Sequence, residues 1–185
     1  MPTHMPADTP TPLPAQIRIR TAVPSDRPLI DRLWLMFRHD LSEFHEVLPF
    51  PDGTFRAERV DSAFTAPGWA PYLFLAPDDR PLGFSFVRAL DTPTAVMNAF
   101  FMVRGARRQG LGLTAALDVV SRHPGPWEVP FQDTNTKAVR FWRRVATAAA
   151  DSWTEEHREI PGHPDLPPDT WISFDTGAGR RGERA

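Results

Sequence analysis

Hydrophobic positions repeat with two different periods along the chain, and these periods separate expected strands from expected helices. Residues 17–22, with the sequence IRIRTA, alternate apolar and basic residues, which predicts a half-buried strand. Residues 24–44 place apolar side chains at 30, 33, 34, 37 and 41, the spacing of one buried helix face. Ser25 and Asp26 are candidate caps for that helix.

The patterns farther along the chain alternate between these two kinds. Apolar, aromatic-rich runs predict strands at 71–76, 81–90, 94–103, 127–132, 152–160 and 170–176. Helical spacing predicts helices at 54–66, 111–122 and 134–150, the last with Thr134 or Asn135 as its cap. This order of elements predicts a mixed α/β sheet.

Composition fits one domain between two tails. A chain of 185 residues is long enough for one full apolar core. Five prolines in the stretch MPTHMPADTPTPLP predict a disordered leader over 1–16, and the glycine and charge of 177–185 predict a disordered tail. We therefore expect the folded domain to span 17–176.

Charge and cysteine content exclude several classes of function. The formal net charge of −2 gives no general attraction to nucleic acid or to an acidic membrane. The absence of cysteine excludes a disulfide framework, a thiolate metal site and a cysteine nucleophile. The sequence also lacks a long apolar run and the basic-then-apolar order of a signal peptide. We expect a cytoplasmic protein with no nucleic-acid partner, no membrane anchor and no metal.

The stretch MVRGARRQGLGLTAALDVV, residues 102–120, carries glycines and arginines between an expected strand and an expected helix. Such a junction leaves backbone N–H groups unpaired at the positive end of the helix dipole, which favours phosphate. Glycine at 110 and 112 permits close approach of the ligand, and Arg107 and Arg108 add positive charge.

Spacing separates the possible phosphate ligands. A Walker loop is excluded because Gly110 is followed by Leu111-Gly112 rather than by lysine and a hydroxyl residue. A dinucleotide-binding fingerprint follows the first strand of a parallel βαβ unit, whereas this loop follows a fourth strand, after hairpins. That class of ligand is therefore disfavoured. The basic run Arg104, Arg107 and Arg108 could also bind nucleic acid. A phosphate-binding loop built on the glycines explains the same arginines with fewer assumptions.

The pattern Arg107-x-x-Gly110-x-Gly112 resembles the pyrophosphate-binding loop of the GCN5-related N-acetyltransferase (GNAT) family. Residues 17–33 are similar to the opening strand and helix of that family, and 81–87 to its central hairpin. The helix pattern Asn135-x-x-Ala138-x-x-Phe141-Trp142 is similar to its Asn-x-x-Ala-x-x-Phe-Tyr helix. The resemblance covers about residues 17–175.

The resemblance implies the acyl-CoA N-acyltransferase fold: a mostly antiparallel sheet of six to seven strands, helices on both faces, and fourth and fifth strands that splay apart. It implies acetyl-CoA as cosubstrate and a small-molecule amine as acceptor, acetylated by direct attack in a ternary complex. The Phe100 amide would polarise the thioester carbonyl, and the Met102 main chain would pair with the pantetheine arm. The residues expected to hold the cosubstrate are Phe100, Met102, Arg107, Arg108, Gln109, Gly110, Leu111, Gly112, Leu113, Asn135, Phe141 and Trp142.

The chain departs from the family pattern at its proton-transfer positions. Trp142 stands where many relatives have a tyrosine acid, and Asn98 stands where many have a glutamate base. Tyr72, the only tyrosine, is expected in the core or at its rim. The segment 39–46 is most simply a solvated helix end, although its acidic balance also suits a cationic acceptor. Candidate catalytic residues are Asn98, Glu128 and Glu43, beside His39, Asp40, His45 and Glu46.

Two alternative functions remain open at this point. The missing tyrosine and glutamate also suit a protein that binds acyl-CoA with little or no turnover. A protein of the same fold that does not bind coenzyme A is a third possibility. Apolar, aromatic edge strands would permit a homodimer.

Overall fold

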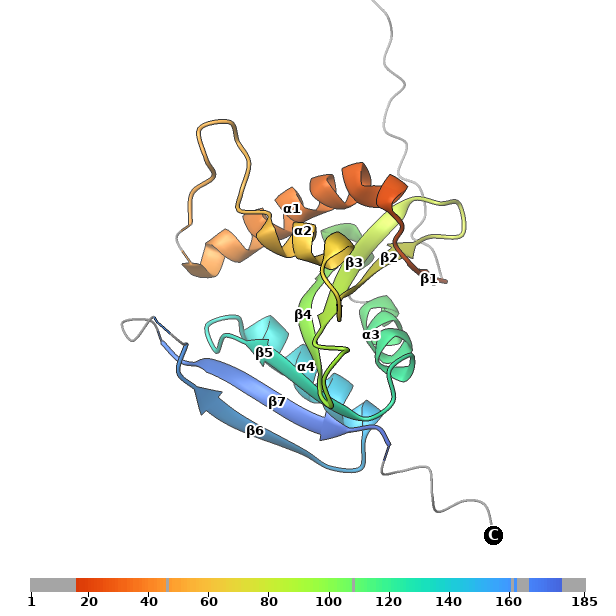
Figure 1. Ribbon diagram of the computed structural model, residues 1–185, viewed down its shortest axis with the longest axis vertical. Helices are drawn as coiled ribbons and strands as arrows, with labels where there is room; N and C mark the ends of the chain where they lie inside the picture. The colour runs from red at the N-terminus through yellow and green to blue at the C-terminus, as the bar shows by residue number, and fades with distance from the viewer. Residues whose placement is uncertain (1–15, 46, 108, 161, 163–166, 178–185) are drawn as a thin grey trace, which may run out of the picture.

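The computed structural model of the protein describes residues 16–45, 47–107, 109–160, 162 and 167–177. Within these residues, seven strands form one sheet in the order β1-β2-β3-β4-β5-β7-β6, and four α-helices pack on it (Figure 1). The strands are β1 (Arg18–Thr21), β2 (Ala70–Leu75), β3 (Pro81–Arg88), β4 (Ala95–Met102), β5 (Pro126–Phe131), β6 (Trp153–Arg158) and β7 (Asp169–Asp175). The helices are α1 (Arg27–His45), α2 (Glu58–Thr65), α3 (Leu111–Ser121) and α4 (Thr136–Ala149).

The sheet is covered on both faces, and neighbouring residues of its central strands point to opposite sides. In β3, Phe84 and Phe86 pack with apolar residues of α1 and α2. Val87 packs in the second cluster, with residues of α3 and α4. Burial on both faces explains why β3 reads as an almost continuous apolar run rather than as an alternating one.

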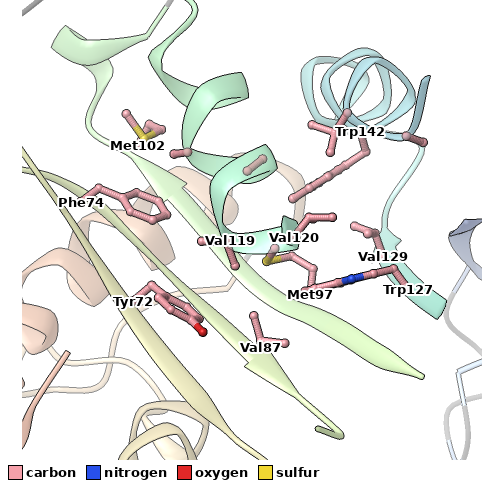
Figure 2. Packing of buried hydrophobic residues seen from close by; sticks show 14 of the residues in the cluster. Tyr72, Phe74, Val87, Met97, Met102, Val119, Val120, Trp127, Val129 and Trp142 are labelled. Carbon is pink, nitrogen blue, oxygen red and sulfur yellow. The ribbon is translucent and has the colours of Figure 1, made fainter. Parts of the chain in front are cut away.

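Figure 2 shows the layer between the sheet and the second pair of helices. Phe74 from β2 and Met97 from β4 lie on the sheet side, and Val119 from α3 and Trp142 from α4 cover them. The strands approach closely at Gly83, where an added Cβ would lie 1.9 Å from the carbonyl oxygen of Phe101. Only glycine fits this crossing of β3 and β4.

The sheet opens between β4 and β5, its one parallel pair among the described strands. These strands pair only at Ala95 with Trp127 and at Val96 with Glu128. The remaining residues of β4 continue without a strand partner on that side, and the rest of β5 pairs only with β7, on its other edge. The sheet therefore has a gap that starts after Val96 and widens toward the loop that follows Met102 (Figure 1).

Every element expected from the sequence is present in the expected order, including the mixed sheet and its opening between the fourth and fifth strands. The second helix is shorter than predicted and begins at Glu58 rather than near Thr54. Thr54 belongs to a turn, in which its N–H and hydroxyl donate to Asp52 at 2.9 and 2.7 Å and its carbonyl accepts from Phe50 at 2.8 Å. No helix in the described part of the chain is long and apolar enough to span a membrane. The expected leader and tail lie almost entirely outside the described residues.

Candidate active site

The loop after β4 gathers unpaired backbone N–H groups at the start of α3. Arg104–Ala106 form a 3-10 turn, and Gly110 is the N-cap of α3 in a left-handed conformation, with φ of 79°. The first bond into the helix runs from the Thr114 N–H to the Gly110 carbonyl at 3.1 Å, so the amides of 110–113 have no acceptor among the described residues. No side chain caps this end and no acidic residue lies in its first turn, which leaves it free for an anion.

The glycines of this loop keep the amides accessible. A Cβ at Gly110 would meet no protein atom within 4 Å, so this part of the loop faces open space. Gly112 lies at the junction of three elements, where a Cβ would contact the Phe141 ring at 3.5 Å and the Met102 side chain at 3.6 Å. The start of α3 therefore rests directly on β4 and α4, and the geometry fits a pyrophosphate held by main-chain N–H groups.

The main-chain groups of Phe100 and Met102 point into the gap between β4 and β5. Val103, one residue past β4, donates its N–H to the Leu82 carbonyl at 2.8 Å. Hydrogen-bonded and non-bonded positions alternate along an antiparallel pair, so Phe101 is the next residue bonded to β3. Phe100 and Met102 therefore turn their N–H and C=O groups away from β3, toward the side on which β4 has no partner.

Asn98 lies where the ladder between β3 and β4 is irregular. The register shifts by one residue between Phe86 and Val87, which leaves Asn98 of β4 without an opposite residue. Its carboxamide oxygen, Oδ1, is buried and has no hydrogen-bond partner among the described residues. A buried acceptor without a donor is unfavourable, and Asn98 lies only two residues past the point where β4 and β5 separate.

Three aromatic side chains line the gap on the side of α4. The Phe100 ring lies 5.3 Å from Phe141 and 5.4 Å from Trp142, measured between centroids. Trp142 is buried and belongs to the core cluster below α3 and α4 (Figure 2). Asn135 accepts a hydrogen bond from the Ala138 N–H at 3.0 Å and so caps α4, as the sequence predicted. The indole of Trp142 therefore serves packing and supplies no acidic proton.

Asp40 connects α1 to the loop after β4. Its carboxylate accepts hydrogen bonds from Arg104 Nε at 3.0 Å and from the Arg107 guanidinium. Burial alone would raise the pKa of Asp40, but these two arginines outweigh it and hold the pKa below its ordinary value of 3.8. Arg107 also donates from Nε to the Met102 carbonyl at 2.8 Å. The Arg107 guanidinium is therefore bonded to groups of the protein itself and is not directed at the unpaired amides of 110–113.

Glu128, a candidate base, is held in an ion pair at the start of β5. Arg158 lies 2.9 Å from Glu128 and 2.5 Å from Glu156, and it stacks on Trp171 at 4.6 Å. The hydrogen bond to Glu128 raises the pKa of Arg158, so its guanidinium stays charged at neutral pH. Glu128 and Asn98 come from the two strands at the closed end of the gap, where Glu128 lies opposite Val96, two residues before Asn98.

The remaining candidates are dispersed. Glu43 is exposed in the last turns of α1, and His39 is exposed on the same helix. Glu46 and Arg108, and the side chain of His45, lie outside the described part of the structure. Tyr72 is buried, as expected, and bonds to His123 Nε2 at 2.6 Å, beyond the C-terminal end of α3 and far along that helix from its glycine loop.

Sequence reasoning did not single out three arginines, which lie on three different elements: Arg38 on α1, Arg59 on α2 and Arg88 at the end of β3. Arg38 follows Trp34 by one helical turn and lies partly buried on the apolar face of α1, with its guanidinium over the rings of Trp34 at 6.0 Å and Phe55 at 5.8 Å. Its Nε is buried and has no partner in the described residues. A cation within the apolar stripe of α1 was the available signal. Arg59 on α2 and Arg88 at the end of β3 carried no comparable pattern.

The described residues contain no cluster of histidine, aspartate and glutamate that could hold a metal ion. Two cavities, of about 410 and 310 Å³, lie away from the glycine loop. The first is between the C-terminal ends of α3 and α4, and the second is beside the start of β5, where Glu128 contributes to its wall. Neither cavity is lined by residues of the loop, so the open amides belong to a separate surface.

Comparison with known proteins rests on structure. No family model and no curated protein sequence matches the chain. Solved structures do match. The chain resembles a GNAT acetyltransferase from Staphylococcus aureus Mu50, with 14% identity, a TM-score of 0.60, and 87% of this chain aligned to 99% of that one. It also resembles the ribosomal-protein-S18-alanine N-acetyltransferase of Escherichia coli, with 12% identity, a TM-score of 0.60, and 92% aligned to 100%.

A third match is the spermidine N-acetyltransferase of Vibrio cholerae, solved in complex with CoA and spermine. The identity is 11%, the TM-score is 0.63, and 88% of this chain aligns to 96% of that one. Identities this low establish the fold alone. The parallel pair of strands that separate, the glycine loop and these matches agree: the protein has the fold of the GCN5-related N-acetyltransferases.

Proposed function

We propose that the protein transfers an acetyl group from acetyl-CoA to the amine of a small molecule. The observation that carries this proposal is the main chain of β4, whose Phe100 and Met102 groups face the gap, in line with the open amides of 110–113. A ligand with a pyrophosphate at one end and an amide-containing arm at the other matches both features.

Different residues would bind the two parts of the ligand, one part at each end of the gap. The N–H groups of 110–113 and the dipole of α3 hold the pyrophosphate. The Met102 main chain bonds the pantetheine arm, and Phe141 and Trp142 bound it on the side of α4. When bound, acetyl-CoA supplies an activated acetyl thioester.

The chemical step rests on positioning more than on proton transfer. The Phe100 N–H donates to the thioester carbonyl oxygen and stabilises the negative charge that develops on it. The buried Oδ1 of Asn98 accepts from the acceptor amine and orients it. Neither Asn98 nor Trp142 moves a proton, and Glu128 is paired with Arg158, so the amine enters as the free base, its ammonium proton already lost to solvent. Its nitrogen would form a bond to the thioester carbon while the carbon–sulfur bond breaks, and the remaining N–H proton would pass through solvent to the coenzyme A thiolate.

A second candidate function is binding of acyl-CoA without efficient turnover. It is favoured by one observation: the candidate carboxylates Asp40 and Glu128 are both held in ion pairs with arginines. The loss of a general base or acid lowers rates by about 10²- to 10⁴-fold rather than completely, and for that reason we favour the enzyme.

The first experiment tests the glycine loop by calorimetry with acetyl-CoA. Gly110→Glu places a carboxylate among the open amides and should weaken binding by about 100-fold or more, since it replaces an attractive site with a like charge. Gly110→Ala controls for the left-handed backbone, and Gly105→Glu adds the same charge at a loop position with open space and ordinary φ. Equal binding by wild type and Gly110→Glu would place the site elsewhere.

The second experiment measures free-thiol release from acetyl-CoA with a panel of amines. Turnover on the order of 1 per second with any amine separates the enzyme from the binding protein. Binding of acetyl-CoA with no release for any amine supports the second candidate instead.

A further inference from the structure

The side chain of Arg107 contacts both the end of β4 and helix α1. Its Nε donates a hydrogen bond to the Met102 carbonyl at 2.8 Å. The central carbon of its guanidinium lies 5.7 Å from the centroid of the Phe101 ring, and the guanidinium also bonds to the Asp40 carboxylate. Met102 and Phe101 are the last two residues of β4, and Asp40 belongs to α1. One side chain therefore joins the strand that borders the gap to a helix far from it in sequence.

These contacts lead the side chain of Arg107 from one face of the sheet to the other. Ala106, its neighbour in the chain, is buried in the cluster beneath α3 and α4. Phe101 packs in the other cluster, with residues of α1 and α2 (Figure 1). A side chain that starts beside α3 and ends on α1 must pass the edge of β4, and on that edge β4 has no strand partner beyond Val96. Arg107 therefore lies across the open edge of β4.

The carbonyl that Arg107 occupies is one of the groups that we assign to the pantetheine arm. Val103 donates to the Leu82 carbonyl, so Met102, one position earlier, turns its C=O away from β3 and toward the gap. An amide N–H of the arm and the Nε–H of Arg107 would both reach this carbonyl from the same open side. The guanidinium also fills space that an arm laid along β4 would need. The arm and the side chain therefore compete for one place.

Asp40 anchors Arg107 in this position. Its side chain is only 18% exposed, and an ion pair that is partly buried is screened less by salt than one at the open surface. Arg104 donates to the same carboxylate from Nε at 3.0 Å, but among the described residues it forms no hydrogen bond with β4. The two arginines of the loop thus share one anchor, and only Arg107 extends from that anchor to the edge of the strand.

We propose that Arg107 blocks the pantetheine site in the free protein and that acetyl-CoA binds by displacing it. This inference rests on the function proposed above and adds a step to it. The bond from Arg107 to the Met102 carbonyl breaks, and an amide N–H of the arm takes its place on that carbonyl. The displaced guanidinium leaves Asp40 and meets a second anion, because the pyrophosphate arrives at the amides that begin three residues later in the chain.

The test compares acetyl-CoA with 3′-phosphoadenosine 5′-diphosphate, which carries the nucleotide and a pyrophosphate but lacks the arm. Calorimetry gives the arm ratio, defined as the Kd of this nucleotide divided by the Kd of acetyl-CoA. A change of charge in the loop alters the affinity for both ligands in the same direction, so it has little effect on their ratio. The bond to Met102 opposes only the ligand that has an arm, and its removal should therefore raise the arm ratio.

Arg107→Ala should raise the arm ratio by about 3- to 10-fold, the equilibrium effect of one hydrogen bond. Asp40→Asn should raise it by a smaller factor, because Arg107 then keeps its bond to Met102 but loses its charged anchor. Arg104→Ala is the matched control, since it removes the same charge from the same loop and a partner of Asp40, and it should keep the wild-type ratio. A ratio unchanged in Arg107→Ala, or raised equally in Arg104→Ala, would overturn the inference.

Nuclear magnetic resonance of the wild-type protein gives a readout that needs no destabilising substitution. The Nε–H signal of Arg107, identified by its loss in Arg107→Lys, should exchange slowly with water in the free protein and shift when acetyl-CoA is added. A signal that does not move while calorimetry shows binding overturns the inference and leaves the proposed acetyltransferase in place. If neither wild type nor any variant binds acetyl-CoA, the proposed function is wrong and this inference is wrong with it.

Discussion

Asp40 offers the sharpest test of how the glycine loop is anchored, through the substitution Asp40→Asn. The carboxylate joins α1 to Arg104 and Arg107, residues that follow it by more than 60 positions in the chain. Asparagine keeps the size of the side chain but removes its charge. The guanidinium of Arg107 would keep only its bond to the Met102 carbonyl.

The expected loss follows from the exposure of the three side chains. The Arg104 side chain is 69% exposed, so its ion pair contributes about 0.5 kcal/mol. The Asp40 side chain is only 18% exposed, and its bond to the half-exposed Arg107 contributes about 1 to 1.5 kcal/mol. Together these lower the free energy of unfolding by about 1.5 to 2 kcal/mol, and Tm by roughly 3–8 °C for a chain of this size.

Thermal unfolding followed by circular dichroism from pH 8 to pH 3 measures this effect and its pH dependence. The pKa of Asp40 is lowered in the folded protein, so its contribution is complete above the unfolded value near 3.8 and is lost as the pH falls through the folded value. The difference in Tm between wild type and Asp40→Asn should therefore be constant above about pH 5 and shrink below pH 4.

Asp31→Asn is the matched control, because Asp31 lies on the same helix and pairs with Arg27 at 2.8 Å while 47% of its side chain is exposed. It should change Tm by no more than about 2 °C, since a surface i,i+4 pair contributes about 0.5 kcal/mol. The reasoning is refuted if Asp40→Asn unfolds at the wild-type temperature at pH 7, or if its deficit persists undiminished at pH 3.

Two further substitutions probe the site and the far end of α3. Trp142→Phe should lower the free energy of unfolding by about 1 to 2 kcal/mol, because the ring is buried. It should leave the pH profile of kcat unaltered, since the indole carries no titrating proton. A shifted pH profile would contradict the assignment of Trp142 to packing. Burial, and then the charge of Arg122, lowers the pKa of His123 in the folded protein. The contribution of His123 to stability is therefore present above pH 6.5 and is lost as the pH falls through the pKa of the folded protein. In thermal melts, His123→Gln should therefore flatten the decline of Tm below pH 6.5. A decline of unchanged slope would exclude His123 as its source.

The sequence predicted those parts of the molecule that depend on local patterns. Strand and helix periods gave every element of the sheet, and the glycines at 110 and 112 indicated the open helix end because φ and N–H exposure are set by neighbouring residues. The cap of α4 was narrowed to Thr134 or Asn135 for the same reason, and Asn135 fills it.

The parts that escaped prediction depend on contacts between distant segments. The bulge at Asn98 arises from the register of two strands, and the engagement of Asp40 with Arg107 spans 67 positions. The engagement of Asp40 by Arg104 and Arg107 therefore could not be obtained from the segment 39–46 alone.

The gap after Val96 means that β4 presents an unsatisfied edge in the interior of a seven-stranded sheet rather than at its rim. An exposed edge invites an extra strand, and elsewhere in nature this is a route to aggregation. Here the row is short and flanked by helices, and the pantetheine arm that we propose for it would complete the ladder. Saturation with acetyl-CoA should then raise the melting temperature, because the ligand binds the folded protein.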